Sequence, residues 1–294
     1  MQPSTFTARE RTAGPGKTST VGTMHPIERL RWVARAPESD VSLAATEAAA
    51  ALAEFAGDPA GLVIACRRLI ERRPACAPLW WVASRVLCAL DPGVEADQAA
   101  AELERDPTPG ILAGELPGGT VAVAGWPEQA GNALRLRARR DGPSEDRSDR
   151  VVVVSGGRPG WRFVEWLESA GVDARLVGPN QAAKAGRRAV LVLLEAHAAG
   201  PAGFLTDPGS EALARAAREA GRPVWLVAGV GRRLPGPLYD ALLARVGEPA
   251  GLEVLALDLV DEVAGPGGLA PVGATGAAAP PACPVAAELL RFRS

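Results

Sequence analysis

The first stretch with a regular hydrophobic pattern runs from His25 to about Asp106, and its period is that of an α-helix. Small apolar residues recur there at intervals of three and four positions, as at Ala45, Ala48, Ala49, Leu52 and Phe55. Such spacing places the apolar residues on one face of each helix. We therefore predict an N-terminal helical domain over residues 24–110.

Capping signals mark two helices within this domain. Asp58-Pro59 is typical of a helix start, and the helix predicted from there stops at Pro74. A second helix is predicted over about 78–90. It carries the pair Trp80-Trp81, which either lines a ligand groove or packs onto the following domain.

Residues 1–23 have no such pattern. They are polar, rich in Gly, Pro and Thr, and aperiodic, so too little apolar surface is available to offset the entropy of ordering. We predict that they form a disordered leader. Methionine occurs only at Met1 and Met24, so both positions are candidates for the true start of the chain.

Beyond residues 106–110, which read Asp-Pro-Thr-Pro-Gly, short apolar runs alternate with amphipathic segments. Strands are predicted at Thr120–Ala124, Val151–Val154, Ala174–Val177, Ala189–Leu194, Val224–Val227 and Glu253–Leu257. Helices are predicted at about 127–139, 160–170, 180–186, 209–220 and 236–246. Apolar strands that alternate with helices are typical of a parallel sheet covered on both faces. Residues 111–294 are therefore predicted to form a Rossmann-like α/β domain with a mostly parallel sheet.

Composition and charge exclude several classes of protein. Hydrophobic residues make up 47% of the 294 residues and charged residues 22%, which is typical of a folded globular chain. A net charge of −2 is too balanced for sequence-independent binding to nucleic acid, so no direct nucleic-acid partner is expected. No apolar run approaches the roughly 18 residues of a membrane helix, and residues 1–23 lack the apolar stretch of a secretory signal. We expect a cytoplasmic protein without a membrane partner.

The four cysteines form no metal-binding or disulfide pattern. Cys66, Cys76, Cys88 and Cys283 are widely spaced, and none belongs to a C-x-x-C pair. Scattered cysteines in a long cytosolic chain are usually reduced and buried. We expect them to be structural, with no metal site and no cofactor. Cys283 precedes a short amphipathic segment, residues 285–290, which is predicted to pack onto the α/β domain.

Glycines follow the first two predicted strands, at the edge where parallel sheets bind ligands. Gly125 and Trp126 come after the first strand, and Gly156-Gly157-Arg158 comes after the second. Glycines allow close approach to the backbone, the next helix begins with unpaired N–H groups, and Arg158 supplies a guanidinium. This combination suits a phosphate or another anion. The alternative is an ordinary glycine-rich turn with an exposed arginine.

His197 is the one histidine of the α/β domain and follows the fourth predicted strand. A histidine there is suited to acid–base catalysis or ligand contact, with its neighbour Glu195 placed to orient it; the alternative is a structural histidine. Gly209-Ser210 opens a later helix and forms a second place suited to an anion. The predicted ligand-binding residues are thus Gly125, Trp126, Gly156, Gly157, Arg158, His197, Gly209 and Ser210.

The order of these features resembles the alpha, beta and delta subunits of translation initiation factor 2B and the related methylthioribose-1-phosphate and ribose-1,5-bisphosphate isomerases. The motifs that carry the resemblance are the glycine turn and strand at 116–123, the strand and Arg-Pro turn at 151–159, residues 193–197 in place of a Gly-Ala-Asp motif, and the helix and strand at 209–227. The resemblance covers roughly residues 40–270. It implies a sheet domain of the ribose-5-phosphate isomerase/CoA transferase type and assembly at least as a homodimer.

The resemblance also implies where catalytic residues would lie. In the isomerases a cysteine after the first sheet strand and the aspartate of the Gly-Ala-Asp motif carry the proton transfers, whereas the cysteine's region here reads Ala-Gly-Trp-Pro at 124–127. His197 or Glu195 takes the place of the aspartate. We therefore expect a non-catalytic member that binds a sugar phosphate or nucleotide at the strand ends. The alternative is a sugar-phosphate isomerase that uses His197 and Glu195, and a thiol or carboxylate within reach of Gly125 would distinguish it.

Overall fold

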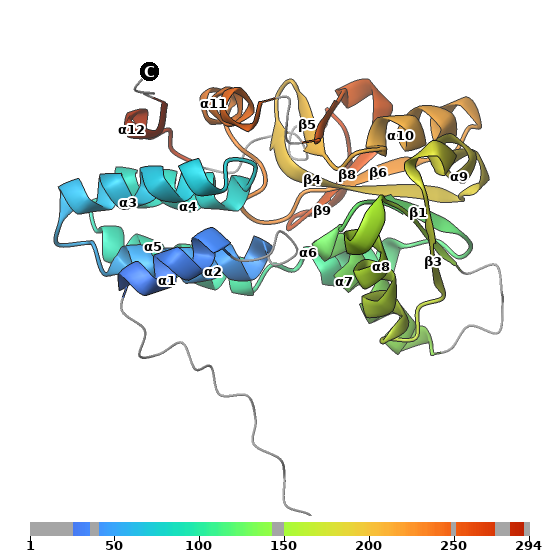
Figure 1. Cartoon of the computed structure of the whole chain (residues 1–294), viewed down its shortest axis with the longest axis horizontal. Helices are drawn as coiled ribbons and strands as arrows, with labels where there is room; N and C mark the ends of the chain where they lie inside the picture. Colours follow the sequence, from blue (N-terminus) through green and yellow to red (C-terminus); the bar gives the residue numbers. More distant parts are fainter. Residues whose placement is uncertain (1–25, 36–40, 143–149, 248–250, 274–282, 291–294) are drawn as a thin grey trace, which may run out of the picture.

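The computed structural model describes residues 26–35, 41–142, 150–247, 251–273 and 283–290. A helical part and a sheet part lie side by side along the long axis of the molecule (Figure 1). The predicted disordered leader, residues 1–23, lies outside the described residues.

Helices make up the described chain before the first strand, as predicted. They are α1 (Pro26–Arg35), α2 (Val41–Ala53), α3 (Pro59–Arg72), α4 (Ala77–Cys88), α5 (Pro92–Glu104) and α6 (Thr108–Glu115). The predicted start of α3 is confirmed, because the Asp58 carboxylate accepts a hydrogen bond from Gly61 N at 3.0 Å. Asp91 caps α5 in the same way. None of the described helices is long and apolar enough to cross a bilayer.

The main sheet has the strand order β3-β2-β1-β4-β6-β8-β9. Its strands are β1 (Val121–Ala124), β2 (Val151–Val154), β3 (Ala174–Val177), β4 (Leu191–Gly200), β6 (Val224–Val227), β8 (Glu262–Gly265) and β9 (Gly268–Pro271). Neighbouring strands are parallel, except that β9 is antiparallel to β8. The prediction of a mostly parallel sheet is confirmed.

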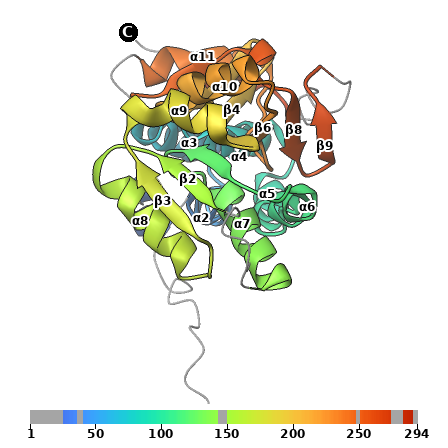
Figure 2. The same cartoon turned by 90° about the vertical axis from the view of Figure 1, so that its right-hand side faces the viewer.

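Helices cover both faces of this sheet (Figure 1 and Figure 2). One face carries α9 (Ala182–Arg188) and α10 (Ser210–Glu219), and the other carries α6, α7 (Glu128–Asp141) and α8 (Gly157–Glu168). Successive strand residues point to opposite faces, so Val152 joins the core under α10 while Val153 joins the core under α7. Both faces are apolar for this reason, and the strands read as unbroken apolar runs in the sequence.

The structure corrects two of the strand predictions. The pattern predicts a fourth strand that ends at Leu194, whereas β4 continues to Gly200 and pairs there with the antiparallel β5 (Gly203–Thr206). The segment predicted as the sixth strand of the sheet begins with β7 (Glu253–Leu255), which pairs with β5 instead. The strand that pairs with β6 is β8. Its four residues include both polar and apolar side chains, so the hydrophobic pattern does not predict a strand there.

The C-terminal segment contacts both parts of the molecule: residues 287–290 pack against residues 236–246 of the predicted α/β domain, as expected, and also against α3 of the helical part. Residues of α11 (Gly236–Val246) and α12 (Ala287–Leu290) belong to the hydrophobic core formed by α2, α3, α4 and α5. The buried Ser84 hydroxyl of α4 donates to the Pro284 carbonyl and accepts a hydrogen bond from Ala286 N at 2.9 Å. These two bonds fix the segment against α4.

Three of the four cysteines are buried, as predicted for structural thiols. Cys66, Cys76 and Cys283 are buried, whereas Cys88, at the end of α4, is exposed, so the prediction that it lies in the core is wrong. Burial raises the pKa of both Cys66 and Cys283 to about 12.

We predict that a thiol reagent at neutral pH labels Cys88 rapidly in the native protein and leaves Cys66 and Cys283 unlabelled. Only the thiolate reacts, and both burial and the raised pKa withhold it at the last two positions. Peptide mass spectrometry after timed labelling measures the difference, with the urea-unfolded protein as the control in which all thiols react. Rapid labelling of Cys283 in the native protein would contradict its buried position.

Candidate functional site

The direction in which strands are added reverses between β1 and β4. From β1 the chain proceeds to β2 and β3 on one side, and then returns to add β4, β6 and β8 on the other side. In a doubly wound sheet such a switch point opens a crevice at the carboxyl ends of the strands, where ligands bind. The residues that follow β1, β2 and β4 are therefore the candidates for ligand contact.

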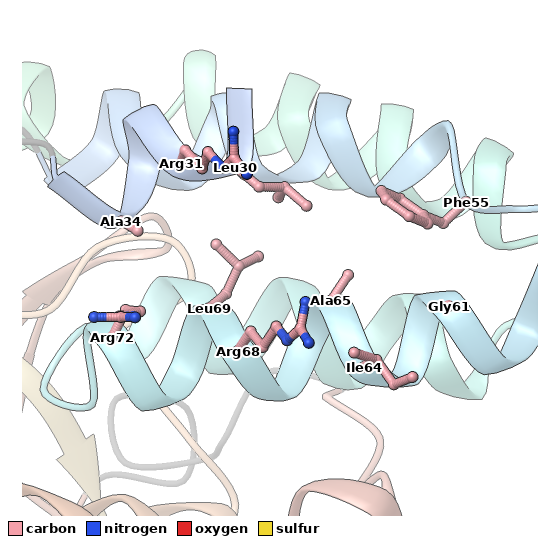
Figure 3. A pocket seen from close by; sticks show the side chains of 10 residues that line it. All are labelled: Leu30, Arg31, Ala34, Phe55, Gly61, Ile64, Ala65, Arg68, Leu69 and Arg72. Carbon is pink, nitrogen blue, oxygen red and sulfur yellow. The ribbon is translucent and has the colours of Figure 1, made fainter. Parts of the chain in front are cut away.

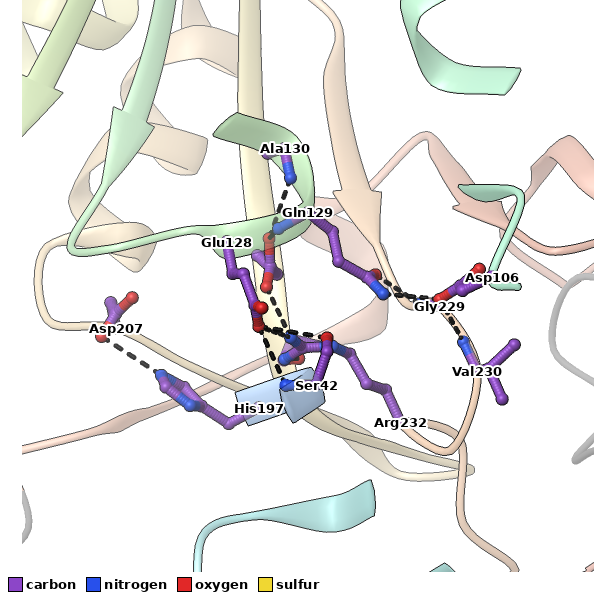
Figure 4. Close-up of polar contacts among 12 residues, drawn as sticks. Ser42, Asp106, Glu128, Gln129, Ala130, His197, Asp207, Gly229, Val230 and Arg232 are labelled. Carbon is purple, nitrogen blue, oxygen red and sulfur yellow. Dashed lines mark hydrogen bonds and ion pairs between the residues drawn. The ribbon is translucent and has the colours of Figure 1, made fainter. Parts of the chain in front are cut away.

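A carboxylate and an imidazole lie side by side at this switch point. Gly125, directly after β1, has φ +65°, and a Cβ on it would lie 2.2 Å from Asp207 Oδ2. Asp207 Oδ1 lies 3.2 Å from His197 Nε2 (Figure 4). The side chains of His197 and Asp207 are 22% and 19% exposed, so solvent reaches both. The carboxylate that distinguishes the isomerase alternative is thus present, as Asp207.

A β-bulge brings His197 to this position. The register between β4 and β5 shifts between Ala196 and Ala198, so that His197 is the extra residue. The sequence places His197 after a strand, whereas it lies within β4. Asp207 is missing from the candidates predicted from the sequence, because it follows β5 and the hydrophobic pattern does not reveal that strand. The sequence signal that could have found Asp207 is its position directly after the short, mainly apolar run Gly203–Thr206.

Glu195 does not orient His197, contrary to the hypothesis drawn from their proximity in the sequence. Its carboxylate accepts hydrogen bonds from the first N–H groups of α7, at 2.8 Å from Gln129 and 3.0 Å from Ala130 (Figure 4). It also forms an ion pair at 2.8 Å with Arg232, whose side chain is 2% exposed. Burial raises the pKa of Glu195, and the guanidinium and the N–H donors oppose that rise. Glu195 therefore fastens α7 to β4.

Carboxylates also join the helical part to the sheet part. Glu128, at the start of α7, accepts hydrogen bonds from the Ser42 backbone N–H and hydroxyl, both at 3.2 Å, and so caps α2. Asp106, between α5 and α6, accepts hydrogen bonds from Gln129 Nε2 at 2.6 Å and from Val230 N at 2.9 Å (Figure 4). The loop after β6 is thereby tied to both parts of the molecule.

An internal carboxylate occupies the start of α10. Gly209 N donates to Glu253 Oε1 at 2.7 Å, and Glu211 N donates to Oε2 at 2.9 Å. The Ser210 hydroxyl is buried and donates to the Asp207 carbonyl. The sequence predicts a place for an external anion here, whereas Glu253 of β7 already takes these N–H groups.

The start of α8 receives no side-chain cap from the described residues. Gly156 precedes the helix, and Gly157 has φ +65°, a backbone conformation that favours glycine. Arg158 is exposed beside them and forms no ion pair within the described part of the chain. These three predicted residues remain accessible at the end of β2.

Trp126 belongs to an aromatic cluster under the sheet. Its ring centroid lies 5.2 Å from that of Phe163 and 6.1 Å from that of Trp166, both on α8. The structure thus gives Trp126 a packing role between β1 and α8.

A separate groove of about 330 Å³ lies between α1 and α3 (Figure 3). Its lining belongs entirely to the helical part and shares no residue with the cluster around His197. Apolar side chains and arginines alternate along it, among them Leu30, Ile64, Leu69, Arg31, Arg68 and Arg72.

No family model and no curated protein matches the sequence. Solved structures, in contrast, match over most of the chain. The translation initiation factor eIF-2B of Pyrococcus horikoshii OT3 has a TM-score of 0.68 at 14% identity, covering 86% of this chain and 98% of that chain. A chain of the tetrameric eIF2B-beta2-delta2 complex from C. thermophilum has a TM-score of 0.63 at 18% identity, covering 83% and 90%. The 5-methylthioribose 1-phosphate isomerase of P. horikoshii OT3 has a TM-score of 0.58 at 18% identity, covering 84% of each chain.

The chain has the fold of the eIF2B subunits. This eIF2B fold occurs both in subunits of an assembly and in an isomerase, so it admits both functions that the sequence leaves open. After β1 this eIF2B-fold chain has Gly125, with Asp207 filling the adjoining space.

We predict that Glu195→Ala lowers the free energy of unfolding by about 3–5 kcal/mol, because it leaves the Arg232 charge buried without its nearest partner. Urea unfolding followed by circular dichroism measures the change. The matched control is Glu211→Ala, which removes a surface pair with Arg215 and costs about 0.5 kcal/mol or less. Equal stability of the two variants would show that the buried cluster does not hold the fold together.

Proposed function

We propose that this protein is a member of the initiation factor 2B family that binds a phosphorylated small molecule, a sugar phosphate or nucleotide, at the strand ends. We infer that it does not isomerise this ligand, because residues 124–127 hold no cysteine where the resemblance implies the thiol of the isomerases. The observation that carries the proposal is the start of α8. Its first N–H groups have no carboxylate cap among the described residues, and the exposed Arg158 lies beside them. Helix N–H groups together with a guanidinium form a strong phosphate site.

Five other helix starts differ from that of α8, whereas the starts of α4, α9 and α11 also lack a side-chain cap. Internal carboxylates take the N–H groups at the starts of α2, α3, α5, α7 and α10; they belong to Glu128, Asp58, Asp91, Glu195 and Glu253. An external anion would have to displace a carboxylate at each of these places. At the start of α8 no described carboxylate caps the helix, and a phosphate there lies beside the Arg158 cation.

The neighbouring strand ends offer contacts for the rest of such a ligand. β2 lies beside β1, and a Cβ on Gly209 would lie 3.3 Å from the Val154 side chain, so the ends of β1 and β2 and the start of α10 lie close together. His197 and Asp207 are polar, partly exposed side chains at this edge. They are suited to hydrogen bonds with sugar hydroxyls.

We predict that Arg158→Ala weakens the binding of 5-methylthioribose 1-phosphate or ribose 1,5-bisphosphate about ten- to a hundredfold, because a hydrogen bond to a charged group contributes about 1.5–3 kcal/mol. Isothermal titration calorimetry on both compounds measures the effect. Arg187→Ala, which removes another exposed arginine, on α9, is expected to leave the affinity unchanged. Unchanged affinity in Arg158→Ala would show that the phosphate does not bind at the start of α8.

A second candidate function, a sugar-phosphate isomerase, is favoured by the contact between Asp207 and His197 beside Gly125. An aldose–ketose isomerisation takes a proton from one carbon and returns one to its neighbour, and a carboxylate next to an imidazole has the groups to do so. The same two compounds are therefore tested for turnover. Turnover by the wild type that is lost in His197→Ala and in Asp207→Asn would overturn the non-catalytic proposal.

We propose further that the protein works in the cytoplasm and assembles at least as a homodimer. The support is the eIF2B fold itself, since chains of this fold form the tetrameric C. thermophilum complex. Light scattering coupled to gel filtration at micromolar concentration is expected to give at least twice the mass of one chain. A monomer mass across the concentration range would contradict the homodimer.

A further inference from the structure

We propose that the groove between α1 and α3 binds a free straight-chain carboxylate, the anion of an unbranched fatty acid. The volume of the groove, about 330 Å³, lies at the lower end of the range of small-molecule sites. None of the strand-end residues proposed for the phosphate lines it, so the proposal does not depend on that site.

The two ends of the groove differ in polarity (Figure 3). Phe55 and Ile64 lie at one end, and Ile64 is 50% exposed although it is apolar. Arg72 lies at the other end, and Arg68 precedes it by four residues on α3. Between the two ends, Leu69 points from α3 toward the wall formed by α1. A ligand that matches this lining has one charged end and one apolar end.

The charged end selects an anion. The side chains of Arg68 and Arg72 are exposed and form no hydrogen bond or ion pair within the described part of the chain. Arg31, the third arginine of the lining, pairs with Glu28 of its own helix, so its charge is compensated. No described carboxylate lines the groove. The lining therefore carries two positive charges without a counter-charge among the described residues.

These two charges lie on one face of α3, because residues four apart on a helix are neighbours. Like charges at this spacing repel each other and weaken the helix. A carboxylate bound between Arg68 and Arg72 offsets the repulsion and accepts a charge-assisted hydrogen bond from each guanidinium. One anionic group therefore satisfies both arginines, whereas a cationic group is repelled.

The narrowness of the groove selects a single chain. Its two walls pack against each other, and packed helices have axes about 8–10 Å apart. A third helix, about 10–12 Å across, is too wide to enter between them. Ala34 of α1 and Ala65 of α3 contribute short side chains to opposite walls, which leaves room for a row of methylene groups.

The length of the groove sets the length of the chain. From Ile64 to Arg72 the axis of α3 advances about 12 Å, at about 1.5 Å per residue. With bonds of about 1.5 Å and bond angles of about 111°, an extended alkyl chain advances about 1.25 Å per carbon atom. A chain of about ten carbons therefore reaches from Ile64 to a carboxylate held between Arg68 and Arg72.

The test uses decanoate below its micelle concentration, with titration calorimetry on the full chain. Decanoate is expected to bind, and decyltrimethylammonium, which has the same chain and the opposite charge, is expected to bind about tenfold or more weakly. Hexanoate is also expected to bind about tenfold or more weakly, because its shorter chain does not reach the apolar end. In crystals of the full chain soaked with 10-bromodecanoate, we expect the anomalous bromine peak between Phe55 and Ile64.

Two variants with matched controls test the two ends. The double variant Arg68→Gln/Arg72→Gln is expected to weaken decanoate binding about tenfold or more. Its control, Arg187→Gln/Arg188→Gln, removes two exposed arginines from α9 and is expected to leave the affinity unchanged.

The apolar end is tested by Ile64→Glu, which places a carboxylate beside the end of the chain and is expected to weaken decanoate binding about tenfold or more. Leu136→Glu, at another exposed apolar position, on α7, is the control expected to bind as the wild type does. Unchanged melting temperatures in the absence of decanoate show that the variants are folded. Both positions are on the surface, so the fold does not depend on them.

Several outcomes overturn the proposal. They are no binding of decanoate, equal affinity for decyltrimethylammonium, full affinity in Arg68→Gln/Arg72→Gln or in Ile64→Glu, and a bromine peak elsewhere. Density for another segment of this chain or for a second copy in the groove of unsoaked crystals also overturns it, as does sedimentation with phosphatidylglycerol vesicles without binding of free decanoate. The phosphate proposal is tested by Arg158→Ala with sugar phosphates, so the two fail separately.

Discussion

The buried ion pair between Glu195 and Arg232 is the interaction on which the arrangement of the molecule depends. Removing two charges from water is costly, and such a pair persists only when most of its polar atoms have partners. Here the start of α7 supplies donors to Glu195, the Ala196 carbonyl accepts from Arg232, and Glu128 extends the cluster to α2. These contacts hold β4, α2, α7 and the loop after β6 in fixed positions relative to one another. The position of these elements determines the shape of the crevice at the strand ends.

Much of the fold is readable from the sequence because local signals and tertiary structure agree. The helix start at Asp58 appears where the capping signal predicts it. The strands β1, β2 and β6 also appear where the pattern predicts them, because each is a short apolar run bounded by turn residues. The pattern misses β5 and β8, and it finds β7 but not the strand with which β7 pairs. These strands are defined by pairing with distant partners, and such pairing leaves little trace in a three- or four-residue segment.

The candidate site is only partly readable for the same reason. The sequence brings Gly125, the turn at Gly156 and His197 to one edge, because the carboxyl ends of parallel strands meet there. It misassigns Glu195 and omits Asp207, since adjacency along a chain says little about which side chains meet in space. The Glu195 carboxylate binds N–H groups at the start of α7 and the guanidinium of Arg232, which lies 37 residues further along the chain. The partner of His197 is Asp207, which follows β5, the strand antiparallel to β4.

Gly125 and Asp207 compete for one volume, and this has a consequence for how such a site changes by mutation. Any side chain at position 125 begins with a Cβ that would lie 2.2 Å from the Asp207 carboxylate, on a backbone with φ +65°. A cysteine therefore cannot be introduced there while Asp207 keeps its place, and a smaller residue at 207 alone leaves His197 without its carboxylate. The two positions are therefore coupled: a side chain at position 125 requires the Asp207 carboxylate to move or to be replaced.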